Sequence, residues 1–337
     1  MKTAIITGIT GQDGAYLAKL LLEKGYQVIG LSRDLLNCNV KNLEYLQIAE
    51  KVHLIELNLL DLSRVSRVIE KFEPDEIYNL AAQSSVGSSF DNPIDTLEYN
   101  TTSVANFLES IRKINSRIKF YQASSSEMFG YIKEENLPIK ESLIFHPVSP
   151  YGVSKASAHW LSVNYREAYG MFTACGILFN HESALRGENY VIKKVINNAV
   201  RIKNGLPAHL QLGNLAIKRD WGYAPKYVEA MWLMLQDDVP GDYIICSGEA
   251  VSLESFIHKV FQQLNLDVEK YVSINPGLLR PLDLPVIYGD NTKAKKELGW
   301  EYNLNTDALI HTLIEDEMQW LEWNLSQSFA SQSKAGI

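Results

Sequence analysis

Thr3-Ala4-Ile5-Ile6-Thr7-Gly8-Ile9-Thr10-Gly11-Gln12-Asp13-Gly14 is the stretch of this sequence that decides the fold. A short apolar run typical of a strand leads into the glycines, and residues 15–24 then repeat leucine with helical spacing. In such a strand–turn–helix, Gly8 allows the tight turn, Gly11 lets the backbone approach a pyrophosphate, and Gly14 allows close packing of helix on strand. The amino end of the helix then faces the phosphates. The plainer alternative is a glycine turn without a ligand.

The alternation of strand and helix continues through the first half of the chain. Strands are predicted at 3–7, 26–31, 53–57, 77–82, 119–124 and 173–179, with helices between them, for example at 62–72 and 96–114. Such alternation is typical of βαβ units, so we predict an α/β fold with a Rossmann-type, doubly wound parallel sheet. Ligands of such sheets bind beyond the carboxyl ends of the strands.

The second half of the chain is less regular, with helices predicted at 227–235, 253–264 and 306–324. We therefore expect residues 1–180 to form a dinucleotide-binding domain, with returns of the chain to the sheet around 213–248. Residues 181–325 should form mainly a smaller, interleaved substrate-binding domain. The Ser/Gln/Ala-rich tail, 326–337, is expected to be frayed.

Composition narrows the functional class. The 337 residues are 46% hydrophobic and 21% charged, as in a globular enzyme, and the net charge of -8 argues against a nucleic acid or a membrane as partner. There is no 18-residue apolar run and no signal-peptide pattern. The cysteines, Cys38, Cys175 and Cys246, are widely spaced, so we expect reduced thiols in a cytoplasmic protein without a metal site.

A tyrosine and a lysine, Tyr151 and Lys155, stand four residues apart just before a predicted helix at 156–169. On one helical face the phenol and the ammonium would lie side by side. A positive charge there favours the phenolate, so the tyrosine could act as a base near neutral pH. The pattern alone is common, and an exposed Tyr/Lys pair is the plainer interpretation.

Small or polar residues follow three of the predicted strands. Residues 80–83, Leu-Ala-Ala-Gln, would let a flat cofactor ring approach, although simple strand–helix packing is the alternative. Residues 123–127, Ala-Ser-Ser-Ser-Glu, bring hydroxyls and a carboxylate to the cleft, or else form a helix N-cap with an acidic first turn. Residues 179–183, Phe-Asn-His-Glu-Ser, add a polar cluster. The cationic side chains scattered beyond this cluster are, considered one at a time, typical surface charges. They would suit a diphosphate if they converged on one pocket.

With these motifs the sequence resembles the extended short-chain dehydrogenase/reductase superfamily, and within it the GDP-mannose 4,6-dehydratase family. The likeness extends from residues 6–14 to 289–295. Its most specific segments are 120–124, 176–183, 212–214, 218–222 and 227–236.

This resemblance implies NADP, or alternatively NAD, in the first domain, a GDP-sugar in the second, and a homodimer or homotetramer. The family's catalytic Thr, Glu, Tyr and Lys correspond to Ser125, Glu127, Tyr151 and Lys155. The expected cofactor contacts are Gly8, Thr10, Gly11, Gln12, Asp13, Gly14, Arg33, Asn58, Leu59, Leu80, Ala82, Tyr151 and Lys155. The expected substrate contacts are Ser84, Asn180, Glu182, Arg186, Lys193, Arg219 and Arg280.

The sequence departs from the family pattern at three places. Ser125 replaces a threonine and lacks the methyl group that restricts its rotamer. Residues 33–37, Arg-Asp-Leu-Leu-Asn, replace Arg-Arg-Ser-Ser-Ser. Arg33 could still pair with the 2′-phosphate of NADP, and Ser32 replaces the acid that favours NAD. Asp34 weakens this preference for NADP. The same loop helps to assemble the family's tetramer. Residues 183–186, Ser-Ala-Leu-Arg, lack one cation of a Ser-Pro-Arg-Arg pattern, which leaves the sugar open.

The reaction that the resemblance implies is conversion of GDP-mannose to GDP-4-keto-6-deoxymannose. Tyr151 would deprotonate the sugar 4-hydroxyl during C4 oxidation, Ser125 would hold the 4-oxygen, and Glu127 would serve the C5/C6 elimination of water before hydride returns to C6. The alternatives are a GDP-heptose 4,6-dehydratase, a nucleotide-sugar 4-epimerase, 4-dehydrogenase or reductase, and a non-catalytic NADP-binding regulator. Glu127 favours elimination, since the epimerases and reductases need no acid at that position.

Overall fold

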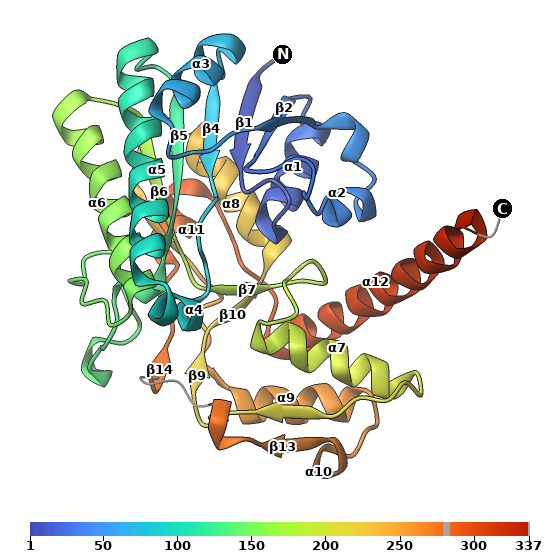
Figure 1. The fold of residues 1–337 in the computed structure, drawn as a ribbon. Helices are drawn as coiled ribbons and strands as arrows, with labels where there is room; N and C mark the ends of the chain where they lie inside the picture. Colours follow the sequence, from blue (N-terminus) through green and yellow to red (C-terminus); the bar gives the residue numbers. More distant parts are fainter. Residues whose placement is uncertain (279–283, 336–337) are drawn as a thin grey trace.

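The computed structural model describes residues 1–278 and 284–335, and a parallel sheet of seven strands organises its first half (Figure 1). The strands are β1 (Thr3–Thr7), β2 (Gln27–Ser32), β3 (His53–Glu56), β4 (Glu76–Asn79), β5 (Lys119–Ser125), β6 (Thr173–Leu178) and β11 (Asp242–Ile245). Their order is β11-β6-β5-β4-β1-β2-β3, which confirms the predicted doubly wound fold. The order reverses between β1 and β4, so a crevice for ligands is expected at the carboxyl ends of these strands.

Helices cover both faces of this sheet, which is why its central strands are continuous apolar runs. Ile5 and Ile6 of β1 and Ile77 of β4 are completely buried. One face is covered by α3 (Leu62–Phe72), α5 (Pro93–Ile114) and α6 (Pro150–Tyr169). The other is covered by α1 (Gln12–Glu23), α8 (Ala224–Gln236) and α11 (Thr292–Leu298).

Helix α6 begins six residues before the predicted helix. Ser149 is its N-cap, its hydroxyl accepting the backbone N–H of Gly152 at 3.0 Å, and Pro150 occupies the first helical position, where proline is favoured. Tyr151 and Lys155 therefore both lie within the first turns of one helix, one turn apart.

A second hydrophobic core lies below the sheet in Figure 1. It is built from α7 (Val191–Lys203), α9 (Leu253–Gln263) and α12 (Thr306–Ala335). Short strands complete it in three small sheets: β7 (Asn180–Glu182) with β10 (Trp221–Tyr223), β8 (Leu210–Leu212) with β13 (Val272–Ile274), and β9 (Lys218–Arg219) with β12 (Val251–Ser252) and β14 (Val286–Ile287). Shorter helices are α2 (Lys41–Tyr45), α4 (Val86–Asp91), α10 (Val268–Tyr271) and 3-10 turns at 49–51, 126–128, 134–136 and 276–278.

The chain returns to the sheet through α8 and β11, and a second time through α11. The end of the chain differs from our prediction. Where we expected a frayed tail from Ser326, α12 continues to Ala335 and extends away from the body of the molecule (Figure 1). Residues 306–335 contain neither glycine nor proline, so nothing in the sequence ends the helix earlier.

The structure also bears on membrane insertion. Within residues 1–278 and 284–335, no helix combines the length and the apolar character needed to cross a membrane.

Candidate active site

The glycine-rich loop between β1 and α1 has the geometry that the sequence predicts. Gly8 adopts a φ of +67°, which only glycine adopts easily, and the N–H of Gly11 donates to the Gly8 carbonyl at 3.0 Å. A Cβ atom on Gly14 would lie 2.3 Å from the same carbonyl oxygen. Glycine at 14 therefore lets α1 pack against the turn, and the helix directs its first N–H groups toward the carboxyl ends of the strands.

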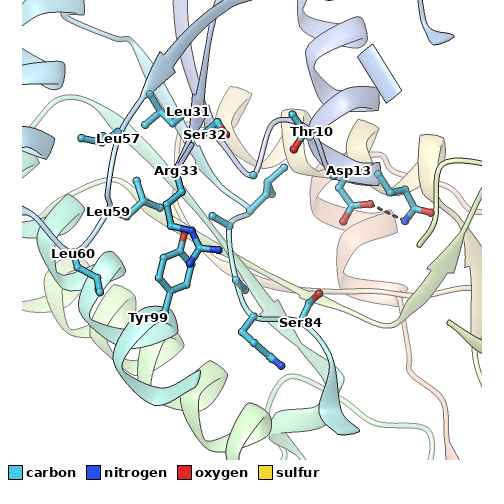
Figure 2. Close-up of a pocket in the computed structure, with 18 of the residues that line it drawn as sticks. Thr10, Asp13, Leu31, Ser32, Arg33, Leu57, Leu59, Leu60, Ser84 and Tyr99 are labelled. Atoms are coloured by element: carbon cyan, nitrogen blue, oxygen red, sulfur yellow. Dashed lines mark hydrogen bonds between the residues drawn. The ribbon is translucent and has the colours of Figure 1, made fainter. Parts of the chain in front are cut away.

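A cavity of about 690 Å³ opens beyond this loop (Figure 2). Ten of the expected cofactor contacts line it: Gly8, Thr10, Gly11, Gln12, Asp13, Gly14, Arg33, Leu59, Leu80 and Ala82. Asn58 does not line it, because its side-chain oxygen accepts the N–H of Leu60 at 3.1 Å within the loop. Tyr151 and Lys155 line a second, adjoining cavity instead.

At the far end of the first cavity, Arg33 lies over the ring of Tyr99, 5.5 Å from the ring centroid (Figure 2). Ser32 ends β2 beside it. Asp34 does not line the cavity: its carboxylate accepts the N–H groups of Leu36 and Asn37 at 2.9 and 3.1 Å. Three further lining residues, Asp95, Glu98 and Tyr99, belong to α5, and the sequence did not predict them because a helix surface facing a cavity has the same pattern as any other polar helix face.

The four expected catalytic side chains converge in the second cavity, of about 260 Å³. Ser125 comes from the end of β5, Glu127 from the turn that follows, and Tyr151 and Lys155 from α6. Five of the expected substrate contacts also line this cavity: Ser84, Asn180, Glu182, Arg186 and Arg219. Asp13, Leu80, Ala82, Ser84 and Arg186 line both cavities, so the two adjoin.

The electrostatics of the Tyr151/Lys155 pair differ from our expectation. Burial raises the pKa of Tyr151, opposed by hydrogen bonding from Ser125, and burial lowers the pKa of Lys155 to about 8. The lysine Nζ donates to the Ala123 carbonyl at 2.9 Å and lies 5.8 Å from the tyrosine ring centroid. Desolvation of the phenol therefore opposes the phenolate that we expected the positive charge of Lys155 to favour.

Ser125 and Glu127 are held together by their own backbone. The Ser125 hydroxyl accepts the N–H of Glu127 at 3.2 Å and caps the 3-10 turn at 126–128. The alternative of an N-cap with an acidic first turn is thus realised too. The cap fixes the serine hydroxyl at the mouth of β5, with the carboxylate two residues away in the same cavity.

Glu182 and Arg186 present buried polar atoms to the second cavity. Their charged groups approach to 3.6 Å, and neither Glu182 Oε2 nor Arg186 Nε has a hydrogen-bond partner among the described residues. Burial raises the pKa of Glu182, and the charge of Arg186 opposes this. Tyr190, missed by the sequence analysis, stacks under Arg186 at 3.8 Å and shares a 2.7 Å hydrogen bond with Ser84. Buried groups of this kind usually have a partner, so a polar ligand fits here.

Two expected substrate contacts are not found at this site. Lys193 lines neither of the two cavities, since its ammonium is buried against Glu317 and the Ala184 carbonyl. Lys193 lies in the first turn of α7, and the sequence around it does not indicate its partner Glu317, which lies 124 residues away. Arg280 lies outside the described residues.

Three possible metal ligands, His159, Cys175 and Asp242, also lie within 4.8 Å of one another behind the site. Arg166 donates to both carboxylate oxygens of Asp242 at 2.8 and 2.9 Å, and His159 Nδ1 lies 3.0 Å from the Ser124 hydroxyl. These contacts make the group a structural network between α6 and the sheet.

Comparison with known proteins places this geometry in a family. The family model described as GDP-mannose 4,6 dehydratase matches residues 5–313. The chain is 44% identical over 330 residues to the Arabidopsis thaliana protein GDP-mannose 4,6 dehydratase 2, covering 94% of this chain and 87% of that one.

Solved structures share the fold at lower identity. UDP-glucose 4-epimerase of Thermotoga maritima, solved with UDP-glucose, superposes with a TM-score of 0.84 at 23% identity, covering 96% of this chain and 99% of that one. dTDP-glucose 4,6-dehydratase of Bacillus anthracis, solved with NAD, has a TM-score of 0.82 at 21% identity, covering 96% and 97%.

Proposed function

This chain belongs to the GDP-mannose 4,6-dehydratase family, and we propose that it converts GDP-mannose to GDP-4-keto-6-deoxymannose and water. The observation that carries the proposal is Glu127, a carboxylate in the same cavity as Ser125, Tyr151 and Lys155. Oxidation at C4 needs only the hydroxyl, the phenol and the lysine. A carboxylate beside them supplies what elimination also requires, a group that takes one proton and gives one back.

The first cavity fits a nicotinamide dinucleotide. Among the described residues, apart from the two neighbours of Gly11 in the chain, only the Gly8 carbonyl lies within 4 Å of the place where a Gly11 side chain would stand, so the bare backbone there is open to a ligand. The first-turn N–H groups of α1 suit a pyrophosphate, and the apolar Leu80 and Ala82 suit a flat ring. When bound, the cofactor accepts the C4 hydride of the sugar and returns it to C6.

NADP is the cofactor that we favour, with NAD as the alternative. Arg33 is a cation in the wall of the cavity beyond the end of β2, where a 2′-phosphate would lie, and Ser32 stands where an acid would favour NAD. The Asp34 carboxylate, which had weakened this preference, is bonded within its own loop.

The protein's own groups would move two protons, that of the sugar 4-hydroxyl and that of C5. Tyr151 takes the proton of the sugar 4-hydroxyl, and because burial raises its pKa, a second positive charge beside Lys155 is needed, as an oxidised nicotinamide provides. Ser125 hydrogen-bonds the 4-oxygen. The C4 ketone acidifies C5, Glu127 accepts the C5 proton, and the same carboxyl protonates the 6-hydroxyl, which leaves as water. When hydride adds at C6, C5 takes up a proton again, and the protonated Tyr151 would return the one that it took from the 4-hydroxyl. Glu182 and Arg186 then face the nucleotide-sugar.

The alternatives differ in one residue and in the sugar. In a 4-epimerase, 4-dehydrogenase or reductase, Glu127 would have no catalytic role. In a non-catalytic regulator, none of the four proposed catalytic side chains would have one. A GDP-heptose 4,6-dehydratase uses the same chemistry and differs only in the sugar that the second cavity accepts.

Incubation with GDP-mannose and with GDP-manno-heptose, followed by mass spectrometry, tests the reaction. We expect the product to lose the mass of one water with no net formation of NADPH. Turnover with unchanged mass, or with stoichiometric reduced cofactor, would assign the chain to one of the other reactions.

The substitution Glu127→Gln tests the carboxylate. We expect dehydration to fall about 10²–10⁴-fold, because an amide cannot accept the C5 proton, while NADPH affinity stays unchanged. The control is Glu135→Gln, at an exposed carboxylate of the adjacent loop that lies near Lys133. Normal dehydration by the Glu127 variant would remove this residue from the mechanism.

Self-association is part of the proposal. Helices α5 and α6 pack side by side and expose apolar side chains, with Ile94 76% and Trp160 57% exposed. Leu97, Val153 and Tyr169 extend this apolar surface on the same two helices. Covering it in a homodimer, or in a homotetramer, would remove it from water. Light scattering on the purified chain gives the number of subunits.

A further inference from the structure

The phosphate-facing loop contains an acidic residue, Asp13, whose charge opposes an anionic ligand. Asp13 is the second residue of α1 and lines both cavities. We propose that His181, which extends from β7 as an imidazolium cation, neutralises Asp13 and thereby permits a cofactor pyrophosphate to bind at the glycine loop. This inference rests on the nicotinamide cofactor of the proposed function and assigns His181 a positioning role that the sequence did not predict.

The hydrogen bonds of His181 fix its protonation. Its Nδ1 lies 2.7 Å from the Phe179 carbonyl oxygen, and its Nε2 lies 2.8 Å from Asp13 Oδ2. A carbonyl oxygen can only accept, so Nδ1 carries a proton. Asp13 also accepts from the Gln12 side-chain amide at 3.0 Å, which favours its ionised form, so Nε2 must donate as well.

The electrostatics of Asp13 agree with this arrangement. Burial raises the pKa of Asp13, but the charge and hydrogen bond of His181, with a smaller effect of Arg186, lower it to about 2. The carboxylate is therefore ionised near neutral pH. Without His181 its charge would act directly on a pyrophosphate at the end of α1, where the partly buried setting screens it little.

Charge and position can be separated experimentally at this contact. His181 stacks on the ring of Tyr227 at 4.5 Å with an interplanar angle of 23°, a contact that another aromatic ring can keep. Neutral hydrogen bonds also join the two segments: Ser183 donates to the Gln12 side chain at 2.8 Å, and Gln12 donates to the His181 carbonyl at 3.1 Å.

The test measures NADPH affinity by fluorescence titration of the full chain without nucleotide-sugar. In His181→Phe the stack remains but the charge is lost, so we expect NADPH to bind about tenfold more weakly or worse. In the double variant Asp13→Asn/His181→Phe no unpaired carboxylate is left, and affinity should return to within about threefold of wild type. Ser183→Ala, which removes a neutral link between the same segments, is the matched control and should bind as wild type does.

The opposite pattern would overturn the proposal. If His181 acts only by holding the two segments together, the double variant binds no better than His181→Phe, because it has lost the same contact. Thermal unfolding of each variant shows whether it is folded. If the wild type binds neither NADPH nor NADH, both this inference and the proposed function fail, whereas unweakened binding by His181→Phe contradicts this inference alone.

Histidine ¹⁵N NMR gives a readout that needs no cofactor. The signal that disappears in His181→Phe belongs to His181, and we expect both of its ring nitrogens to carry a proton, as its contacts with the Phe179 carbonyl and the Asp13 carboxylate require. A neutral tautomer in the wild-type protein would contradict the proposed charge directly.

Discussion

Ser125 lacks the methyl group that restricts the rotamer of a threonine, but a hydrogen bond restricts its hydroxyl instead. The methyl group of a threonine would restrict the rotamer, but here the N–H of Glu127 donates to the serine hydroxyl and holds it. The hydroxyl is therefore placed by the backbone of the turn, and a methyl group adds little.

We expect Ser125→Thr to change kcat by less than about threefold, because the cap already orients the oxygen, and Ser125→Ala to lower it by at least about tenfold. Steady-state kinetics with GDP-mannose compare the two. A large gain of activity in the threonine variant would show that the serine hydroxyl is poorly held.

Arg33 and Asp34 are neighbours with different surroundings, so their substitutions should differ. Arg33→Ala should weaken NADP binding about ten- to hundredfold, since a charge-assisted pair with the 2′-phosphate is lost, and leave NAD binding nearly unchanged. Asp34→Asn is the control, because that carboxylate is bonded within its own loop. Titration with both cofactors decides: a rise in NADP preference in the Asp34 variant would contradict the assignment.

Among the elements, the turn between β1 and α1 carries the closest packing near the site. Gly14→Ala should destabilise the chain by about 2–4 kcal/mol, because the new methyl group would enter the Gly8 carbonyl. Gly11→Ala meets the same oxygen at 3.3 Å and should cost less. Denaturant unfolding compares the two, and equal losses would contradict the packing role of Gly14.

The same elements show what the sequence could and could not predict. All six strands that we predicted are present, because each one carries a short group of apolar residues that packs within the sheet. The end of β5 and the turn after it bring Ser125 and Glu127 into one cavity with Tyr151 of α6. Helix α7 was missed, and so was the pairing of Lys193 with Glu317, because a contact between residues far apart in sequence leaves no local pattern.

At the scale of the whole molecule, a buried ion pair connects the second core to the active site. Lys193 of α7 bonds to Glu317 of α12, and the same ammonium donates to the carbonyl of Ala184, two residues before Arg186. Asn197 donates to the other Glu317 oxygen at 2.7 Å. The pair therefore fixes the loop of Arg186 against the helices beneath it.

Glu317→Gln should destabilise the chain by about 3–5 kcal/mol, because it leaves Lys193 buried without its anion. The control is Glu315→Gln two residues earlier, where the carboxylate is 60% exposed and lies near His311. Denaturant unfolding measures both variants. If the two lose the same stability, the buried pair is not what holds α7 on α12.

The path of the chain between its two cores has a consequence for how such enzymes diversify. The chain leaves the sheet after β6, returns through α8 and β11, leaves again, and returns through α11 before ending in α12. No single breakpoint in the sequence separates one core from the other, so neither core can be exchanged as one continuous segment. New sugar specificity on this scaffold must therefore arise by substitution within the loops that line the second cavity, rather than by recombination of ready-made modules.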